Sequence, residues 1–193
     1  MNLLVDRLPQ TVLACGQEWP IRTNFRVGIL FELLMQDPRI SDEEKLLRAL
    51  SLYYPQLPND LGAASKGLIW FYRCGEDTPQ KQADTKGVPQ RIYSFEQDAG
   101  RIFAAFQATY QIDLNDVEYL HWWKFRVMFS ELPEESSFGK VMGYRAMRIT
   151  SEMTPAQRQF YGRMKALYKL PDERSEDEKT RAFASIFAGG LRV

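Results

Sequence analysis

Cysteine and histidine are almost missing from this chain of 193 residues, which contains two cysteines and one histidine. Cys15 and Cys74 lie far apart and form no CxxC pair, so they offer neither the usual zinc-ligand spacing nor a disulfide framework. His121 has no second imidazole with which to share a metal ion. We therefore expect free thiols in a reducing compartment, and no metal or other cofactor.

An excess of charge of one sign is also missing. Lysine plus arginine number 25 and aspartate plus glutamate number 25, so the formal net charge is +0. A general nucleic-acid binder usually needs a basic excess to neutralise phosphates, so nucleic acid is not an expected partner. The strip of Lys140, Arg145 and Arg148, with Tyr144 for stacking on a base, leaves a nucleic-acid interpretation open. We favour an ordinary helix surface whose cations balance the glutamates nearby.

Long apolar runs and targeting signals are absent as well. No run approaches the roughly 20 apolar residues of a membrane-spanning helix. The start, MNLLVDRLPQ, has no basic segment followed by a long apolar stretch, as a signal peptide would. The protein is therefore expected to be soluble and to stay in the cytoplasm where it is made.

The sequence motifs of common enzyme classes are missing too. The chain has no GxxxxGK(S/T) phosphate loop, no GxGxxG, no GxSxG and no HExxH. A pair of carboxylates brought together by the fold is the one catalytic arrangement that the sequence leaves open. His121 would need a nucleophile and an orienting carboxylate to act as a general base, and the sequence places neither beside it. We expect a structural or interface histidine, and a protein that is not an enzyme.

Turn and helix signals predict a mainly α protein with a small N-terminal β-hairpin, an α+β arrangement. The hairpin comprises TVLA (11–14), a CGQ turn and EWPI (18–21). Apolar residues at helical spacing, bounded by capping residues and by glycine or proline, predict seven helical stretches. These stretches are 22–36, 37–55, 60–75, 93–114, 115–133, 136–150 and 154–170. The predicted caps include Thr23 or Asn24 for the first stretch, and Ser41, Ser94, Asn115 and Thr154 for later ones.

The helical body is predicted to divide into two portions. Residues 1–74 comprise the hairpin and the first helices. Residues 75–90 contain one large apolar residue, Val88, so they are expected to form a flexible linker or an exposed loop. Residues 91–170 form a second helical portion that is expected to pack on the first. Residues 171–193 are interpreted as a charged spacer followed by an amphipathic tail.

The segment Tyr119–Phe129, YLHWWKFRVMF, holds two of the four tryptophans and the single histidine. Its large side chains go nearly all the way round a helix, which is typical of a helix that is buried or packed on two sides. Two interpretations stay open: burial within the chain, or a core on one side and a protein partner on the other. The candidate core residues are Leu120, Phe125 and Val127, with Phe103 and Phe106 from the preceding helix. The candidate partner-binding residues are Trp122, Trp123 and Phe129, with Phe183, Ile186 and Phe187 at i, i+3 and i+4 in the tail.

Three short runs carry a family resemblance: Leu-His-Trp-Trp-x-Phe at Leu120–Phe125, Leu-Pro at Leu132–Pro133, and Met-Gly-Tyr-Arg at Met142–Arg145. Together with FELLMQDPRISDEEKLLRALSLYYP and LIWFYRCG, they resemble the bacteriophage gene-product-fifteen family of long-tailed phages and prophages. The resemblance extends from about Val12 to Leu170.

The resemblance implies a role in tail morphogenesis rather than a reaction. Members of this family look like products of genes that lie between the major tail protein and the tape measure, a position typical of tail assembly chaperones. We therefore expect a chaperone-like protein that binds the tape measure protein and the major tail protein in the cytoplasm of an infected or lysogenic bacterial host. It is expected to form a homo-oligomer, because repeated subunits coat a long partner more stably. The alternatives are a structural head–tail connector or tail-completion protein, which would remain in the virion, and a nucleic-acid-binding phage protein.

Overall fold

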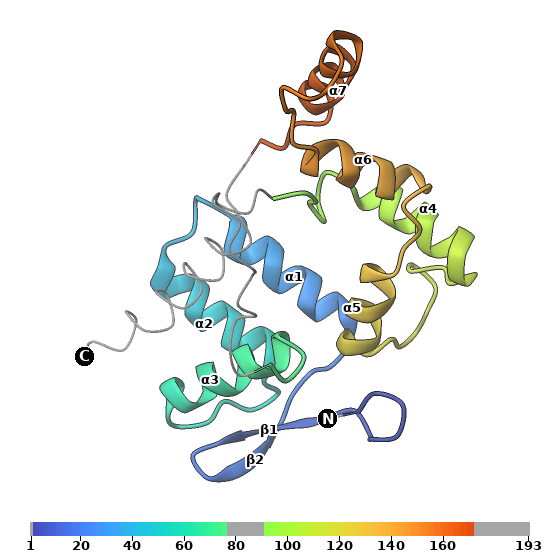
Figure 1. Ribbon diagram of the computed structural model, residues 1–193. Helices are drawn as coiled ribbons and strands as arrows, with labels where there is room; N and C mark the ends of the chain where they lie inside the picture. Colours follow the sequence, from blue (N-terminus) through green and yellow to red (C-terminus); the bar gives the residue numbers. More distant parts are fainter. Residues whose placement is uncertain (1, 77–90, 172–193) are drawn as a thin grey trace. The chain divides into compact units, whose positions relative to one another are not determined.

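The computed structural model describes residues 2–76 and 91–171, which form one β-hairpin and seven α-helices (Figure 1). The prediction of a mainly α protein with a small N-terminal hairpin is confirmed for this part of the chain. The elements are β1 (Thr11–Ala14), β2 (Gln17–Pro20), α1 (Phe25–Gln36), α2 (Asp42–Tyr53), α3 (Leu61–Tyr72), α4 (Ala99–Tyr110), α5 (Trp122–Ser130), α6 (Ser137–Ala146) and α7 (Pro155–Leu167). The predicted linker, apart from its first two residues, and the predicted tail beyond Pro171 lie outside the described residues.

The helices group into two compact units. The first comprises residues 2–76 together with 118–128, and the second comprises residues 91–117 together with 129–171. The predicted portions, residues 1–74 and 91–170, therefore differ from the observed units in the placement of residues 118–128. Most of α5 belongs with the hairpin and α1 to α3, although a long stretch of sequence separates them.

The hairpin turns at Cys15 and Gly16. Both residues have a positive φ, of 54° and 71°, which is the pair of left-handed conformations that a two-residue turn between twisted strands requires. Val12 and Ala14 on β1 are buried, whereas Leu13 between them is exposed. This alternation places one face of β1 against α3.

The close approach of β1 to α3 depends on Gly67 in the middle of α3. A Cβ atom at this position would lie 3.1 Å from Cγ2 of Val12 and 3.0 Å from the hydroxyl oxygen of Tyr54. The Tyr54 hydroxyl donates to the carbonyl of Ala64 at 2.7 Å in the same place. Glycine therefore leaves just enough room for the strand and the tyrosine to pack on this helix.

Each of the first three helices begins with a side chain that accepts from the free N–H groups of the first turn. Asn24 accepts from Arg26, Ser41 accepts from Glu44, and Asp60 accepts from Gly62 and Ala63. Three fully buried rings, one from each of these helices, meet edge to face. The Tyr53 ring lies 5.5 Å from the Phe31 ring and 6.1 Å from the Phe71 ring, measured between centroids. These rings form the centre of the core of the first unit.

The second unit has its own aromatic cluster. The Phe129 ring lies 5.0 Å from Tyr93, 5.4 Å from Phe95 and 5.3 Å from Phe138, measured between centroids. Helix α4 begins at Ala99, later than the predicted cap at Ser94. The residues between form a turn, so the predicted start of this helix was early.

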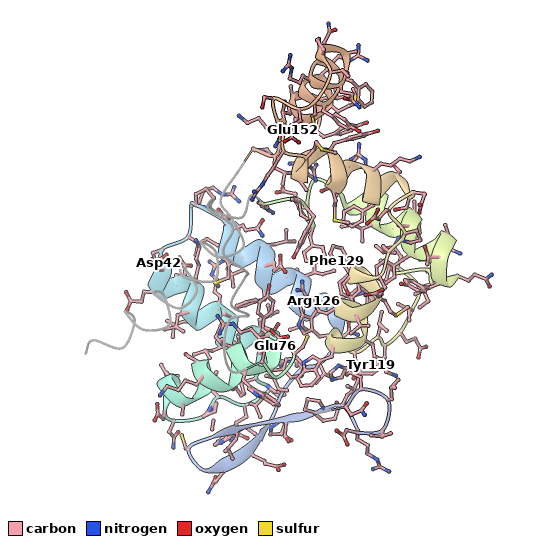
Figure 2. The ribbon with its side chains drawn as sticks, in the orientation of Figure 1. Asp42, Glu76, Tyr119, Arg126, Phe129 and Glu152 are labelled. Atoms are coloured by element: carbon pink, nitrogen blue, oxygen red, sulfur yellow. The ribbon has the colours of Figure 1, made fainter. Side chains whose placement is uncertain are left out.

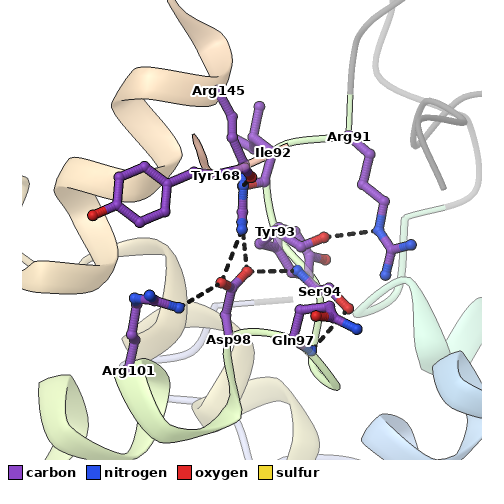
Figure 3. Close-up of polar contacts among 9 residues, drawn as sticks. All are labelled: Arg91, Ile92, Tyr93, Ser94, Gln97, Asp98, Arg101, Arg145 and Tyr168. Atoms are coloured by element: carbon purple, nitrogen blue, oxygen red, sulfur yellow. Dashed lines mark hydrogen bonds and ion pairs between the residues drawn. The ribbon is translucent and has the colours of Figure 1, made fainter. Parts of the chain in front are cut away.

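A buried ion pair joins α4 to α6 in the second unit (Figure 3). Arg145 is 5% exposed and Asp98 is 0% exposed, and two hydrogen bonds of 2.5 and 3.0 Å join the guanidinium to the carboxylate. Arg145 also donates to the carbonyls of Tyr168 at 2.6 Å and Ile92 at 3.0 Å. The backbone N–H of Ser94 donates to Asp98 at 3.0 Å. A buried ion pair is tolerated when its remaining donors and acceptors are satisfied in this way.

This pairing alters the predicted basic strip. Lys140 and Arg148 are exposed, but the Arg145 guanidinium is buried against a carboxylate. Tyr144 stacks on Tyr168, with 5.9 Å between the ring centroids and 10° between the planes. The strip therefore lacks its central cation, and the nucleic-acid interpretation loses its main support.

We expect the substitution Arg145→Met to lower the free energy of unfolding by about 3–5 kcal/mol, because it leaves the Asp98 carboxylate buried without its partner. The matched change Arg148→Met, at an exposed arginine of the same unit, should alter it by less than about 0.5 kcal/mol. Urea unfolding followed by circular dichroism measures both. Equal losses in the two variants would show that the buried pair has no special role.

Candidate functional site

Helix α5 begins at Trp122, later than the predicted start after Asn115. The Asp113 carboxylate accepts from the backbone N–H groups of Asn115 and Asp116, at 2.8 and 3.2 Å, and closes a turn there. Asn115 therefore caps no helix, and the prediction of a helix from this residue is wrong. The aromatic segment enters its helix from an extended stretch instead.

The N-termini of α1 and α5 are paired side by side (Figure 1). The backbone N–H of Phe25 donates to the carbonyl of Leu120 at 2.8 Å, and that of Trp122 donates to the carbonyl of Thr23 at 2.7 Å. The two segments thus form a single antiparallel β-bridge. Each bond uses an N–H group at a helix start that has no acceptor within its own helix.

His121 is the residue before α5, and both of its ring nitrogens are used within the first unit. Nδ1 accepts from the backbone N–H of Trp123 at 3.1 Å, so the proton is on Nε2, which donates to the carbonyl of Pro9 at 3.0 Å. Burial lowers the pKa of His121; the hydrogen bond to Pro9 opposes this effect, and the charge of Lys124 adds to it. The imidazole is therefore a neutral helix cap, with neither nitrogen free to bind a metal or to accept a proton from a substrate.

The two adjacent tryptophans complete the hydrogen bonding at the C-terminus of α3. The indole N–H of Trp122 donates to the carbonyl of Tyr72 at 2.8 Å, and that of Trp123 donates to the carbonyl of Phe71 at 2.7 Å. The last carbonyls of a helix have no partner within the helix, and leaving one buried and unpaired costs about 1–3 kcal/mol. The indoles supply these partners from another part of the chain.

Backbone N–H groups just beyond α3 also donate to carbonyls at this end of the helix. Gly75 N–H donates to the carbonyl of Trp70 at 2.9 Å, and Cys74 N–H donates to that of Phe71 at 3.0 Å, which is the Schellman arrangement. Cys74 and Gly75 have φ values of 58° and 83°. A Cβ at Gly75 would lie 2.9 Å from Cη2 of Trp123, so this glycine also makes room for the indole.

A column of stacked rings runs through the same region. The centroids of Tyr72 and Trp122 are 5.5 Å apart, those of Trp122 and Phe125 are 5.8 Å apart, and those of Phe125 and Phe25 are 5.0 Å apart, with no interplanar angle above 23°. Gly28 in α1 faces this column, since a Cβ there would lie 2.2 Å from Cε3 of Trp122. We call His121, Trp122, Trp123 and Phe125, with the end of α3 and the start of α1, the aromatic junction.

Polar contacts lie on either side of the aromatic junction, at Tyr119 and Arg126, which are labelled in Figure 2. The hydroxyl of Tyr119 lies 2.8 Å from the hydroxyl of Thr23. The Arg126 guanidinium lies over the Trp122 ring, 5.6 Å from its centroid, and 3.9 Å from a carboxylate oxygen of Glu32. The junction is therefore bounded by polar groups and filled with rings.

The structure brings some of the candidate residues into the core and leaves others out. Leu120, Phe125 and Phe106 are buried, and Phe103 is half-buried. Val127 is 44% exposed, so its prediction as a core residue is wrong. Trp122, Trp123 and Phe129 are buried, at 0%, 2% and 6% exposed, so they present little side-chain surface to a partner in this conformation. Phe183, Ile186 and Phe187 lie outside the described residues.

Two hydrogen-bonding arrangements of this fold were not predicted from the sequence. One is the buried Arg145–Asp98 pair, and the other is the use of indole N–H groups as helix caps. Across residues 2–76 and 91–171, no three or more His, Cys, Asp or Glu side chains gather as a metal site would require. Within the same ranges no helix is long and apolar enough to cross a membrane.

His121, Trp122, Trp123 and Phe125 of the aromatic junction fall on the Leu-His-Trp-Trp-x-Phe run, and Arg145 of the buried ion pair falls on the Met-Gly-Tyr-Arg run. A family model described as Bacteriophage Gp15 protein matches residues 4–170. The chain belongs to the bacteriophage Gp15 family. The resemblance stated from these runs is thereby confirmed, and the Gp15 match covers both units. It indicates a phage structural or morphogenesis-related protein. No curated protein and no solved structure matches the chain.

We expect Gly28→Ala to destabilise this Gp15 protein by about 1–3 kcal/mol, because the added methyl group overlaps a stacked indole that has no room to move. Gly143→Ala is the matched control. It lies in the helix α6 with nothing within 4 Å of the new Cβ, so it should stabilise the protein by about 0.5–1 kcal/mol. Chemical unfolding curves distinguish the two, and a stabilising Gly28→Ala would contradict the packing at the junction.

The lowered pKa of His121 gives stability a defined dependence on pH. The unfolded chain, whose histidine titrates near 6.5, binds a proton more readily than the folded chain. Stability should therefore be complete above that value and fall as the pH decreases from 6.5 toward the folded-state pKa. The urea midpoint measured between pH 8 and pH 5 tests this.

The control for that measurement is His121→Asn, which keeps a side-chain acceptor for the start of α5 and removes the titrating group. The difference in urea midpoint between the wild type and this variant should shrink as the pH falls below 6.5. A difference that stays constant with pH would show that the imidazole does not titrate differently in the two states.

Proposed function

We propose that this protein is a tail assembly chaperone, which binds the tape measure protein and the tail-tube subunits while a long phage tail is built. The observation that carries the proposal is the family match over residues 4–170. The motif runs that support membership also imply a gene position between the major tail protein and the tape measure. The proposal places the protein in the cytoplasm of the host, where tails assemble.

The proposed action is binding rather than catalysis. His121, the single histidine, has both ring nitrogens engaged by backbone groups, which supports a structural role. Arg145 and Asp98 are likewise occupied with each other and with backbone groups. The polar side chains of the family motifs thus serve the fold, and the partner-binding surface lies elsewhere on the chain.

An exposed apolar helix supports the binding role. No residue of α7 is buried, and Phe160 and Leu167 on this helix are 46% and 65% exposed. Large apolar side chains that remain accessible on a structured helix are typical of surfaces that bind other proteins. We further propose that several copies of the protein associate, since a row of subunits binds a long partner more tightly than one subunit does.

The test is light scattering on a sizing column, with the protein alone and mixed with the tape measure protein or the major tail protein of its own phage. We expect a co-eluting complex with a defined number of copies per partner. An unrelated coiled-coil protein of similar length serves as the control and should elute separately. The protein should also be missing from purified virions. Its presence there, without a complex in solution, would replace the chaperone with a head–tail connector or tail-completion protein.

A further inference from the structure

Helix α7 is stabilised by its own capping residues and buries none of its side chains in the core. Thr154 and Gln157 form a reciprocal capping box, with hydrogen bonds of 2.9 and 3.2 Å, and Pro155 occupies the first position of the helix. Isolated helices of this length are marginal in water, and most helices in proteins depend on burying one face. Helix α7 has no buried residue, so its capping residues stabilise a helix whose exposed side chains are accessible to a partner.

A line of exposed residues on α7 has the sequence spacing of a helix-pairing seam. Ala156, Phe160, Arg163 and Leu167 are separated by four, three and four residues and are all exposed. Alternation of fours and threes keeps side chains on one line along a helix, as in coiled coils. We call these four residues the α7 seam.

Contacts with α6 fix the orientation of the seam. The Tyr144 ring lies 6.1 Å from the Phe160 ring and 5.9 Å from the Tyr168 ring, measured between centroids. Lys165 donates to the carbonyl of Met147 at 2.9 Å. Phe160 of the seam therefore packs partly on Tyr144 of α6, while Phe160 and Leu167 remain 46% and 65% exposed.

The charge on α7 itself is of one sign. Helix α7 contains Arg158, Arg163 and Lys165 and no aspartate or glutamate, whereas Glu152 precedes the helix along the chain and Asp172 follows it. Arg163 lies within the seam itself, between its two large apolar residues. Covering this cation with an apolar partner would leave a buried charge without a counter-charge, which is strongly unfavourable. A second α7 would bring a like charge to the same place, which disfavours pairing of two seams.

We propose that the α7 seam docks an acidic amphipathic helix of the tape measure protein, with apolar residues against Phe160 and Leu167 and a carboxylate against Arg163. The inference rests on the proposed function, because that function supplies the partner. The apolar residues give the area of contact, and the carboxylate selects the partner and its register.

The test uses the full chain and a fluorescent designed peptide of about 20 residues, long enough for several helical turns. The peptide carries leucines along one seam and glutamates beside them, and a second peptide has lysine at every glutamate position. Fluorescence anisotropy should detect binding of the acidic peptide and not of the basic one. The substitution Arg163→Glu should weaken the acidic peptide by about tenfold or more and gain affinity for the basic one.

The matched control is Arg158→Glu. It makes the same charge change on the same helix, but it lies about 160° away from Phe160 around the helix axis. Binding of the acidic peptide should stay within about twofold. Equal weakening by the two substitutions would overturn the proposal, because it would show general electrostatic attraction instead of a seam.

Three other occupants of the α7 seam would give different results, and each of those results would overturn the proposal. Residues 172–178 hold five carboxylates, so the chain's own end is one competitor; in that case Phe183→Ser with Phe187→Ser in the full chain would raise peptide affinity. A dimer that Arg163→Glu dissociates would point to a second copy. Binding of phosphatidylglycerol vesicles without binding of the peptide would point to a lipid surface.

Failure of this inference is separable from failure of the proposed function. If the tape measure protein co-elutes equally with the wild type and with Arg163→Glu, and the peptide does not bind, the chaperone role stands and the seam is not its surface. If the peptide binds with the expected charge dependence while the tape measure protein never co-elutes, the seam stands as a helix-binding surface and its assigned partner falls.

Discussion

The first unit depends on one constraint, which is that backbone groups inside an aromatic core must still be hydrogen-bonded. Three successive residues, the cap His121 and the first two residues of α5, meet this requirement for two other segments. His121 donates to Pro9, Trp122 donates to Tyr72, and Trp123 donates to Phe71. Each side chain places a ring in the core and directs its N–H at a backbone carbonyl of a segment distant in sequence. This is why residues 118–128 belong with the hairpin and the first three helices.

The second unit solves the same problem with charge. Arg145 satisfies the carbonyls of Ile92 and Tyr168, and Asp98 neutralises its charge by direct hydrogen bonds. In both units, the polar atoms of the family motif are directed at backbone groups of distant segments. A sequence run that identifies the family thus encodes long-range contacts that hold each unit together.

The features that could be predicted from sequence are those set by neighbours along the chain. The hairpin turn at Cys15 and Gly16, the caps at Asn24 and Ser41, and the capped start of α7 depend on a few adjacent residues. The start of α5 could not be predicted this way. Asn115 has a good capping side chain, but the backbone carbonyl of Asp113 accepts from the Val117 N–H that such a cap would need. The extended stretch before Trp122 is held by Thr23 and Phe25. The burial of Arg145 and the exposure of Val127 likewise depend on partners remote in sequence.

The order in which the chain is synthesised determines when the first unit can fold. The first unit needs residues 118–128, which leave the ribosome only after a long stretch of other sequence. At ordinary elongation rates, roughly 3–10 seconds separate the emergence of α3 from that of Trp122 and Trp123. During that interval the end of α3 lacks its indole donors, and the face of α1 around Gly28 lacks its ring. The N-terminal half of this protein is therefore completed by a segment translated late, so a nascent chain halted before Met128 cannot reach the native first unit.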